Sequence, residues 1–171
     1  MANKTVISST IGVNLQGNSD GATANFQLGS HVLGNAGSSW MYVSAAGAIT
    51  TGALVAINSA FTAKLALATD LFGTVAGNGM QLAFAQGAFA AADFGWVCIR
   101  GDNMVVAVSN VSTLGAALYV STNSGIITTA AGSGTLAGII LATASASGVL
   151  NAATTAYLQY PRLSAGALFG V

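Results

Sequence analysis

The sequence predicts an all-β fold, an antiparallel β-sandwich or barrel with an extended N-terminal arm and little helix. Three observations lead to this prediction. From residue 38 onward, short apolar runs alternate with turn residues at a spacing of roughly 8–12 residues, as in sandwiches and barrels. Val, Ile and Thr are frequent, and their branched side chains favour strands. Glycine recurs every few residues, which disfavours helices although alanine is abundant.

The first 37 residues are predicted to form the arm. Asn, Gln, Ser and Gly are dense there, and the apolar residues are isolated. Such a segment has too little apolar surface for a core of its own, so we expect it to become ordered by docking. A frayed terminus is the alternative.

The β domain is predicted over residues 38–163, followed by a C-terminal tail over residues 164–171. The predicted strands are 40–44, 48–50, 54–58, 64–67, 80–85, 95–100, 104–109, 118–121, 126–129, 138–142 and 156–160. Arg100-Gly101-Asp102-Asn103 is predicted as a hairpin turn between two of them, because Gly, Asp and Asn tolerate turn geometry.

Two segments resemble each other, residues 42–51 and residues 119–129. Both begin Tyr-Val-Ser, contain a glycine and end Thr-Thr, and the second is one residue longer. A shared hairpin type explains this without duplication, and two copies are too few for a solenoid.

The charge content is unusually low. The chain has four basic and four acidic residues, or 5% charged, against about 25% in an average soluble domain. Because so little charge protects a free monomer poorly, we expect much of the surface to be covered by partners. Four cations over the whole chain are too few to neutralise the phosphates of a nucleic acid, so we expect no nucleic-acid partner. The most apolar stretch, 80–99, is interrupted by polar residues, so we expect a soluble, cytoplasmically made chain with no membrane partner.

The residues offer little for catalysis, and we expect no enzyme activity, metal or cofactor. His31 lies in the polar arm and Cys98 in an apolar strand, where an inert buried thiol is expected. The four Asp residues are far apart, and turn or capping roles explain them. The glycine motifs lack nucleotide-binding spacing. Arg100-Gly101-Asp102 spells the integrin-binding tripeptide, but we attribute these residues to the predicted hairpin turn.

A series of short motifs carries a resemblance. It runs Phe26-Gln27-Leu28-Gly29, then Trp40-Met41-Tyr42-Val43-Ser44-Ala45, Gly47-Ala48-Ile49, Gly52-Ala53-Leu54-Val55-Ala56-Ile57-Asn58, Phe94-Gly95-Trp96-Val97-Cys98-Ile99-Arg100-Gly101, Leu118-Tyr119-Val120-Ser121 with Gly125, Gly138-Ile139-Ile140-Leu141 and Leu158-Gln159-Tyr160-Pro161-Arg162-Leu163. In order and pattern this resembles small phage head decoration (capsid cement) proteins, which are encoded near major capsid proteins. The segment 151–155 and the tail after Leu163 depart from it.

The resemblance implies a structural virion protein on the outer capsid surface of a bacteriophage. It would cement neighbouring major capsid protein subunits, commonly as a homotrimer. The residues that we expect to contact the capsid or another subunit are Val6, Ile11, Val13, Leu15, Phe26, Leu28, His31 and Trp40. The alternative is another virion surface component, such as a fibre base or receptor-binding knob.

Overall fold

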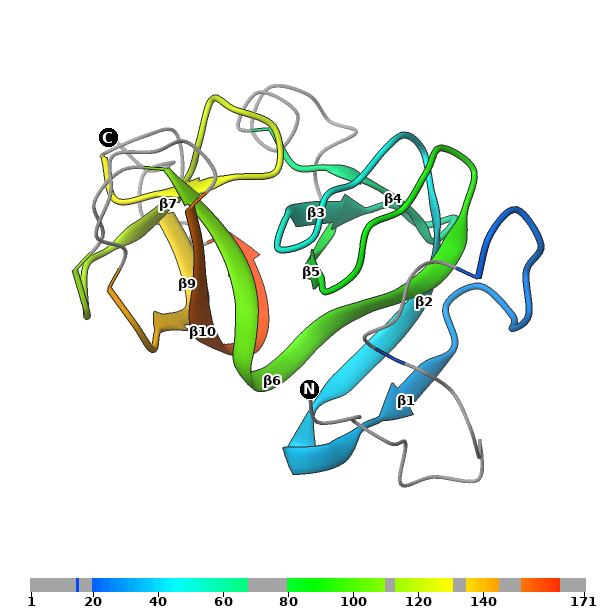
Figure 1. Cartoon of the computed structure of the whole chain (residues 1–171), viewed down its shortest axis with the longest axis horizontal. Coiled ribbons are helices and arrows are strands. Elements are labelled where there is room, and N and C mark those ends of the chain that lie inside the picture. The colour runs from blue at the N-terminus through cyan, green and yellow to red at the C-terminus, as the bar shows by residue number, and fades with distance from the viewer. Residues whose placement is uncertain are drawn as a thin grey trace, which may run out of the picture.

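In the part of the chain that the structure describes, the regular secondary structure is β-strand apart from one short helical turn (Figure 1). The computed structural model describes residue 15 and residues 20–67, 80–109, 113–130, 135–144 and 152–163. The strands are β1 (His31–Leu33), β2 (Ser39–Ala45), β3 (Leu54–Ile57), β4 (Thr62–Leu65), β5 (Gln81–Ala85), β6 (Phe94–Ser109), β7 (Leu118–Val120), β8 (Ile127–Thr128), β9 (Thr135–Leu141) and β10 (Ala152–Leu163). Within these residues the only helical element is a 3-10 turn, η1 (Asn35–Gly37). The predicted all-β class is confirmed, in its barrel form.

Five strands close into a first barrel. Around the ring the order is β2, β4, β3, β5 and the first half of β6, which pairs again with β2. All neighbours are antiparallel except β2 and β4. The interior is filled mostly by Ala, Val and Ile side chains from all five strands. Because a barrel with fewer strands is narrower, a five-stranded barrel has room only for small side chains. The alanine-rich composition therefore matches this interior.

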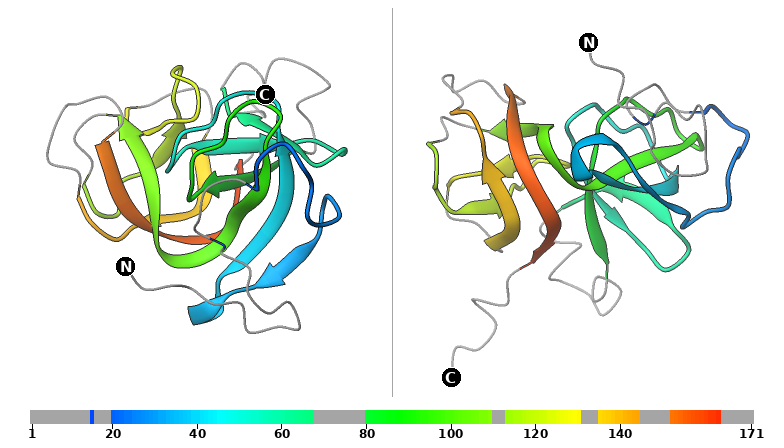
Figure 2. Two further views of the ribbon diagram at one scale, coloured as in Figure 1. Left: turned by 45° about the vertical axis from the view of Figure 1, so that its right-hand side comes forward. Right: turned by 90° about the horizontal axis from the view of Figure 1, so that it is seen from below.

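A second ring of five strands is built on the same β6. Here β6 pairs with β10, followed by β9, β7 and β8, and β8 returns to β6. Only β6 and β8 run parallel. The 16-residue β6 is thus the last strand of the first barrel and the first strand of the second. Figure 2 shows the two barrels side by side, joined by this green strand.

The two barrels have the same connectivity. In each, the first strand pairs parallel with the third and antiparallel with the fifth, and the second strand lies between the third and the fourth. The turn before the second strand is also shared. Gly52 and Gly115 have φ of 82° and 76°, and the next residue's N–H donates to the carbonyl two residues before the glycine. The fold is therefore a tandem of two like units.

The hairpin predicted at residues 100–103 is wrong, because these residues lie inside the continuous β6. Asn103 has a left-handed φ of 53°, which bends the strand without reversing it. The partner β10 runs across the bend, pairing with Arg100 on one side and with Met104 on the other, with a register shift between them. Gly and Asn serve bulges as readily as turns. The bend directs one strand into two barrels.

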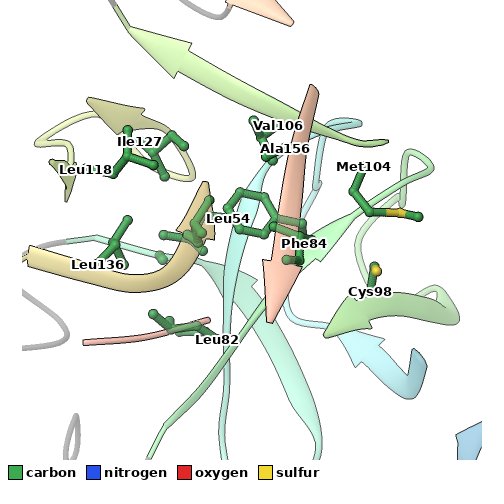
Figure 3. Close-up of a cluster of buried hydrophobic side chains, with 14 of the residues drawn as sticks. Leu54, Leu82, Phe84, Cys98, Met104, Val106, Leu118, Ile127, Leu136 and Ala156 are labelled. Carbon is green, nitrogen blue, oxygen red and sulfur yellow. The ribbon is translucent and has the colours of Figure 1, made fainter. Parts of the chain in front are cut away.

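A shared core joins the barrels (Figure 3). The outer face of the first barrel contributes Leu54, Leu82 and Phe84. They pack with the interior side chains of the second barrel, among them Val106, Leu118, Ile127, Leu136 and Ala156. Because β3 and β5 are buried on both faces, their sequences show no polar alternation. The two barrels consequently form one packed body.

The described part of the predicted arm lies against the first barrel of its own chain. Gly21 bridges to Phe94, and Phe26 packs on Tyr42 and Trp96. Within the predicted arm lies β1, an unpredicted strand that pairs antiparallel with β2. Residues 1–14, 16–19 and 164–171, which include the start of the predicted arm and the tail, lie outside the described residues.

Two other predicted strands differ from the structure. Residues 48–50 form no strand, and Ile49 makes only an isolated bridge to Phe89. Residues 156–160 are the middle of a longer β10, which extends at both ends along β6 and β9. A single bridged residue is too short a pairing to make a strand of this segment.

Candidate functional site

The predicted contact residues divide into three groups. Val6, Ile11 and Val13 lie outside the described residues. Leu15 and Trp40 are buried in this chain's own core, where the Trp40 indole N–H donates to the Ser38 hydroxyl at 3.0 Å. Phe26 and Leu28 are half-buried against the core, and His31 is exposed. The structure does not bring these residues together into one exposed patch.

An aromatic cluster holds the segment around residues 20–28 on the first barrel. The Phe26 ring meets the Tyr42 ring edge-on, with 5.3 Å between the ring centroids, and it is tilted against the Trp96 ring at the same centroid distance. The Tyr42 hydroxyl donates to the Asp20 carboxylate at 2.6 Å and accepts from the Asn25 N–H at 3.0 Å. Burial and the Asp20 hydrogen bond raise the pKa of Tyr42 from 10.0 to about 12. Half-buried Phe26 therefore has a clear role within the chain, and its contact with a partner stays a prediction.

The exposed apolar surface is concentrated elsewhere. Six large apolar or aromatic side chains are exposed in the described part of the chain: Leu33, Phe61, Leu114, Ile140, Tyr157 and Tyr160. Three of these, Ile140, Tyr157 and Tyr160, line one pocket of about 620 Å³ together with Arg100, Gly138, Gln159 and Arg162. We call it the tyrosine–arginine pocket. It is open to solvent and lies on β6, β9 and β10, where the two barrels join.

Strand pairing places the lining residues. Tyr157 of β10 lies directly opposite Ile140 of β9, and Gln159 lies opposite Arg100 of β6. The alternation of β10 turns Tyr157 and Gln159 outward and buries Leu158 between them. The pocket wall is thus a row of cross-strand neighbours on a closed sheet. A surface of this kind is held rigidly by its backbone.

A bulge adds Tyr160 to this row. Between the pairs Leu158–Ile139 and Arg162–Ala137, three residues of β10 face one residue of β9, which is Gly138. Tyr160 has a left-handed φ of 50°, and its side chain is exposed beside that of Gln159. Left-handed backbone is costly for a tyrosine and is found preferentially at functional sites. Ala36, Phe61, Ala92 and Asn103 are left-handed too, and the bulge at Tyr160 is the one that shapes this pocket.

Only glycine fits at position 138. Its φ is 78°, and a Cβ there would overlap the Gln159 carbonyl oxygen and lie 2.9 Å from that of Tyr160. The close approach of β9 to the bulge thus depends on the absence of a side chain. The shape of the pocket follows from this approach.

A smaller pocket of about 250 Å³ shares Tyr160 with the first. His31 and Leu33 of the edge strand β1 line it, together with the buried Ile99 of β6. Leu33 is the fourth exposed apolar side chain in this region. Because Tyr160 belongs to both pockets, they form one surface that extends from β9 to β1. His31, predicted as a contact residue, lies on this surface.

The surface has positive charge. Arg100 and Arg162 line the larger pocket, none of the described acids lines it, and neither arginine forms an ion pair with any described carboxylate. Guanidinium groups that no described carboxylate pairs with, placed beside tyrosine rings, are suited to binding a carboxylate-bearing partner.

The candidate catalytic groups of the sequence are dispersed. Cys98 is buried, and its thiol donates to the Arg100 carbonyl at 3.1 Å. Asp93 accepts a hydrogen bond from the Ala90 N–H, which is the predicted turn role. Asp70 lies outside the described residues. In the described ranges, no three His, Cys, Asp or Glu side chains gather as a metal site would require. No described helix has the length and apolarity to cross a membrane.

Searches against protein-family models and against curated proteins found no match to this sequence.

The predicted set missed most of the pocket residues: Arg100, Ile140, Tyr157, Tyr160 and Arg162. A signal was present in the sequence, since residues 157–162 contain two of the four tyrosines, one of the four cations and the only proline. Tyr and Arg are the residues most enriched at interaction hot spots. The exposure of Tyr160, however, depends on the bulge, which no local pattern indicates.

Proposed function

We propose that this chain is a structural virion protein that binds the outer surface of a bacteriophage capsid and cements neighbouring major capsid protein subunits. The observation that carries the proposal is the exposed surface of tyrosine, isoleucine and arginine side chains on a rigid double barrel. Such side chains make strong protein contacts when a partner covers them. The order of motifs, which resembles that of capsid cement proteins, gives the partner.

The fold supports this role mechanically. Two closed barrels that share β6 and a common core resist deformation, because all strands except the edge strand β1 are paired on both sides within the rings. Low charge favours burial against other chains. A protein that binds only the assembled shell stabilises that shell by mass action.

The proposal is tested by co-sedimentation of the purified chain with empty heads assembled from the major capsid protein of the same virus. We expect saturable binding at a fixed number of copies per head and no binding to unassembled capsid protein. An absence of binding at micromolar concentrations would reject the proposal. Attachment at a single vertex would favour the fibre-base alternative.

A homotrimer is the proposed solution state. Light scattering coupled to size exclusion should give three times the chain mass of 16.8 kDa. A monomeric mass would refute the trimer in solution and leave trimer formation only on the shell surface. Specific interfaces of standard size bury about 800 Å² per partner, and the trimer contact is expected to be of that order.

A further inference from the structure

We propose that the tyrosine–arginine pocket is the capsid-binding site itself, and that it binds an acidic segment of the partner that carries Asp or Glu next to an apolar side chain. This inference rests on the proposed function, which gives the partner. The pocket gives the chemistry of the bound segment.

Charge selects the acidic partner. The pocket contains two of the four cations of the chain, no described acid lines it, and both guanidinium groups lack a described carboxylate partner. Arginine forms bidentate hydrogen bonds with carboxylates. The acids that the structure describes, Asp20, Asp93 and Asp102, lie outside the lining, which leaves both guanidinium groups to carboxylates of a ligand as far as the described residues go.

Apolar surface and size select a side-chain cluster as the ligand. Tyr157 and Tyr160 are 45% and 52% exposed, and Ile140 opposite Tyr157 is 62% exposed. A volume of about 620 Å³ lies within the range of about 300–1,000 Å³ that is typical of binding pockets. An aliphatic residue of the partner would pack between the rings while neighbouring carboxylates meet Arg100 and Arg162.

Backbone strain gives independent support. The left-handed Tyr160 and the close approach of Gly138 keep the ring exposed at a conformational cost. A strand that continued its regular alternation would avoid this cost. The bulge instead places Tyr160 between the two pockets, where it would contact both parts of a bound segment.

The first experiment measures binding of variants to empty heads of the same virus by co-sedimentation. Arg100→Gln with Arg162→Gln, and separately Ile140→Ser, should each weaken binding by about tenfold or more. Leu114→Ser is the matched control, because Leu114 is also 62% exposed but lies outside the pocket, and its binding should stay within about twofold of wild type. Binding of the wild type should also fall with added salt.

The second experiment uses poly-L-glutamate as the probe, titrated into the free protein. We expect salt-sensitive binding that the double arginine variant loses and that competes with head binding. If the wild type binds heads and the variants bind equally well, the pocket inference is wrong and the proposed function stands. If heads are not bound but poly-L-glutamate binds through the arginines, the proposed function fails and the acidic-ligand pocket stands.

Two further outcomes would overturn the inference. A smaller solution mass of the double arginine variant would show that a second copy of this chain occupies the pocket. Tighter binding of a DNA oligonucleotide than of poly-L-glutamate would assign the arginines to phosphate. Unchanged urea unfolding of the variants is required throughout, and is expected because the substituted side chains are exposed.

Discussion

Replacement of Gly138 by alanine should destabilise the protein strongly. Left-handed backbone at φ 78° costs a non-glycine residue about 1–2 kcal/mol. The added Cβ would also overlap the Gln159 carbonyl oxygen, and forced overlap in a packed region costs about 1–3 kcal/mol more. The expected decrease in the free energy of unfolding is therefore about 2–5 kcal/mol.

The chain provides a matched control at Gly115. Its φ of 76° is nearly the same, but a Cβ there would meet nothing within 4 Å. Gly115→Ala should consequently lose only the conformational part, about 1–2 kcal/mol. Gly52→Ala should lie between the two, because its Cβ would be 3.2 Å from the Ala107 nitrogen.

Urea unfolding followed by circular dichroism measures all three variants against wild type. The difference between the losses of unfolding free energy in Gly138→Ala and Gly115→Ala gives the cost of the overlap with the bulge of β10. Equal losses for these two variants would refute the reasoning, because they would mean that β9 and β10 separate there without cost.

Two other predictions concern single side chains. Tyr42 has a folded-state pKa of about 12 against 10.0 unfolded, so folding favours its protonated form and this stabilisation is present below pH 10 and lost between pH 10 and 12. Stability should fall by about 1–2 kcal/mol over that range, and Tyr42→Phe should remove this part of the pH dependence in urea unfolding; an unchanged profile would contradict it. Gln86→Met should cost about 2–4 kcal/mol, because the Gln86 amide bonds the Val105 N–H and carbonyl at 2.9 Å each and the variant leaves both groups unpaired. A loss under 1 kcal/mol in the same assay would indicate that water replaces the amide.

The all-β class was predictable because strand periodicity and turn residues recur along the whole chain. The continuity of β6 was not, because Arg100-Gly101-Asp102-Asn103 has the composition of a turn and acts as a bulge. The choice between the two is made by β10, which pairs across the bend from more than 50 residues away in sequence.

The tandem of barrels was also hidden in the sequence. The similar segments 42–51 and 119–129 begin in β2 and β7, which are the first strand of one barrel and the second strand of the other. Their likeness therefore reflects a common strand-and-turn pattern. The equivalent strands of the two barrels share their connectivity and the turns at Gly52 and Gly115, but their sequences show little similarity.

The candidate site was only partly predictable. Isolated apolar residues in a polar segment suggested exposed contacts, yet Leu15 and Trp40 are buried because the described part of the N-terminal segment covers the outer face of the first barrel. His31 lies on the surface that the pockets define. Tyr157 and Ile140 become neighbours only through the β9–β10 register, which is a long-range property.

The central claim, that this chain cements a capsid, is tested most directly by heating empty heads with and without the bound protein. Light scattering and electron microscopy would report the temperature at which the shells open. This temperature should rise with the number of bound copies and fall back when Arg100→Gln and Arg162→Gln are combined. Heads that bind the protein fully but open at the same temperature as bare heads would contradict the claim.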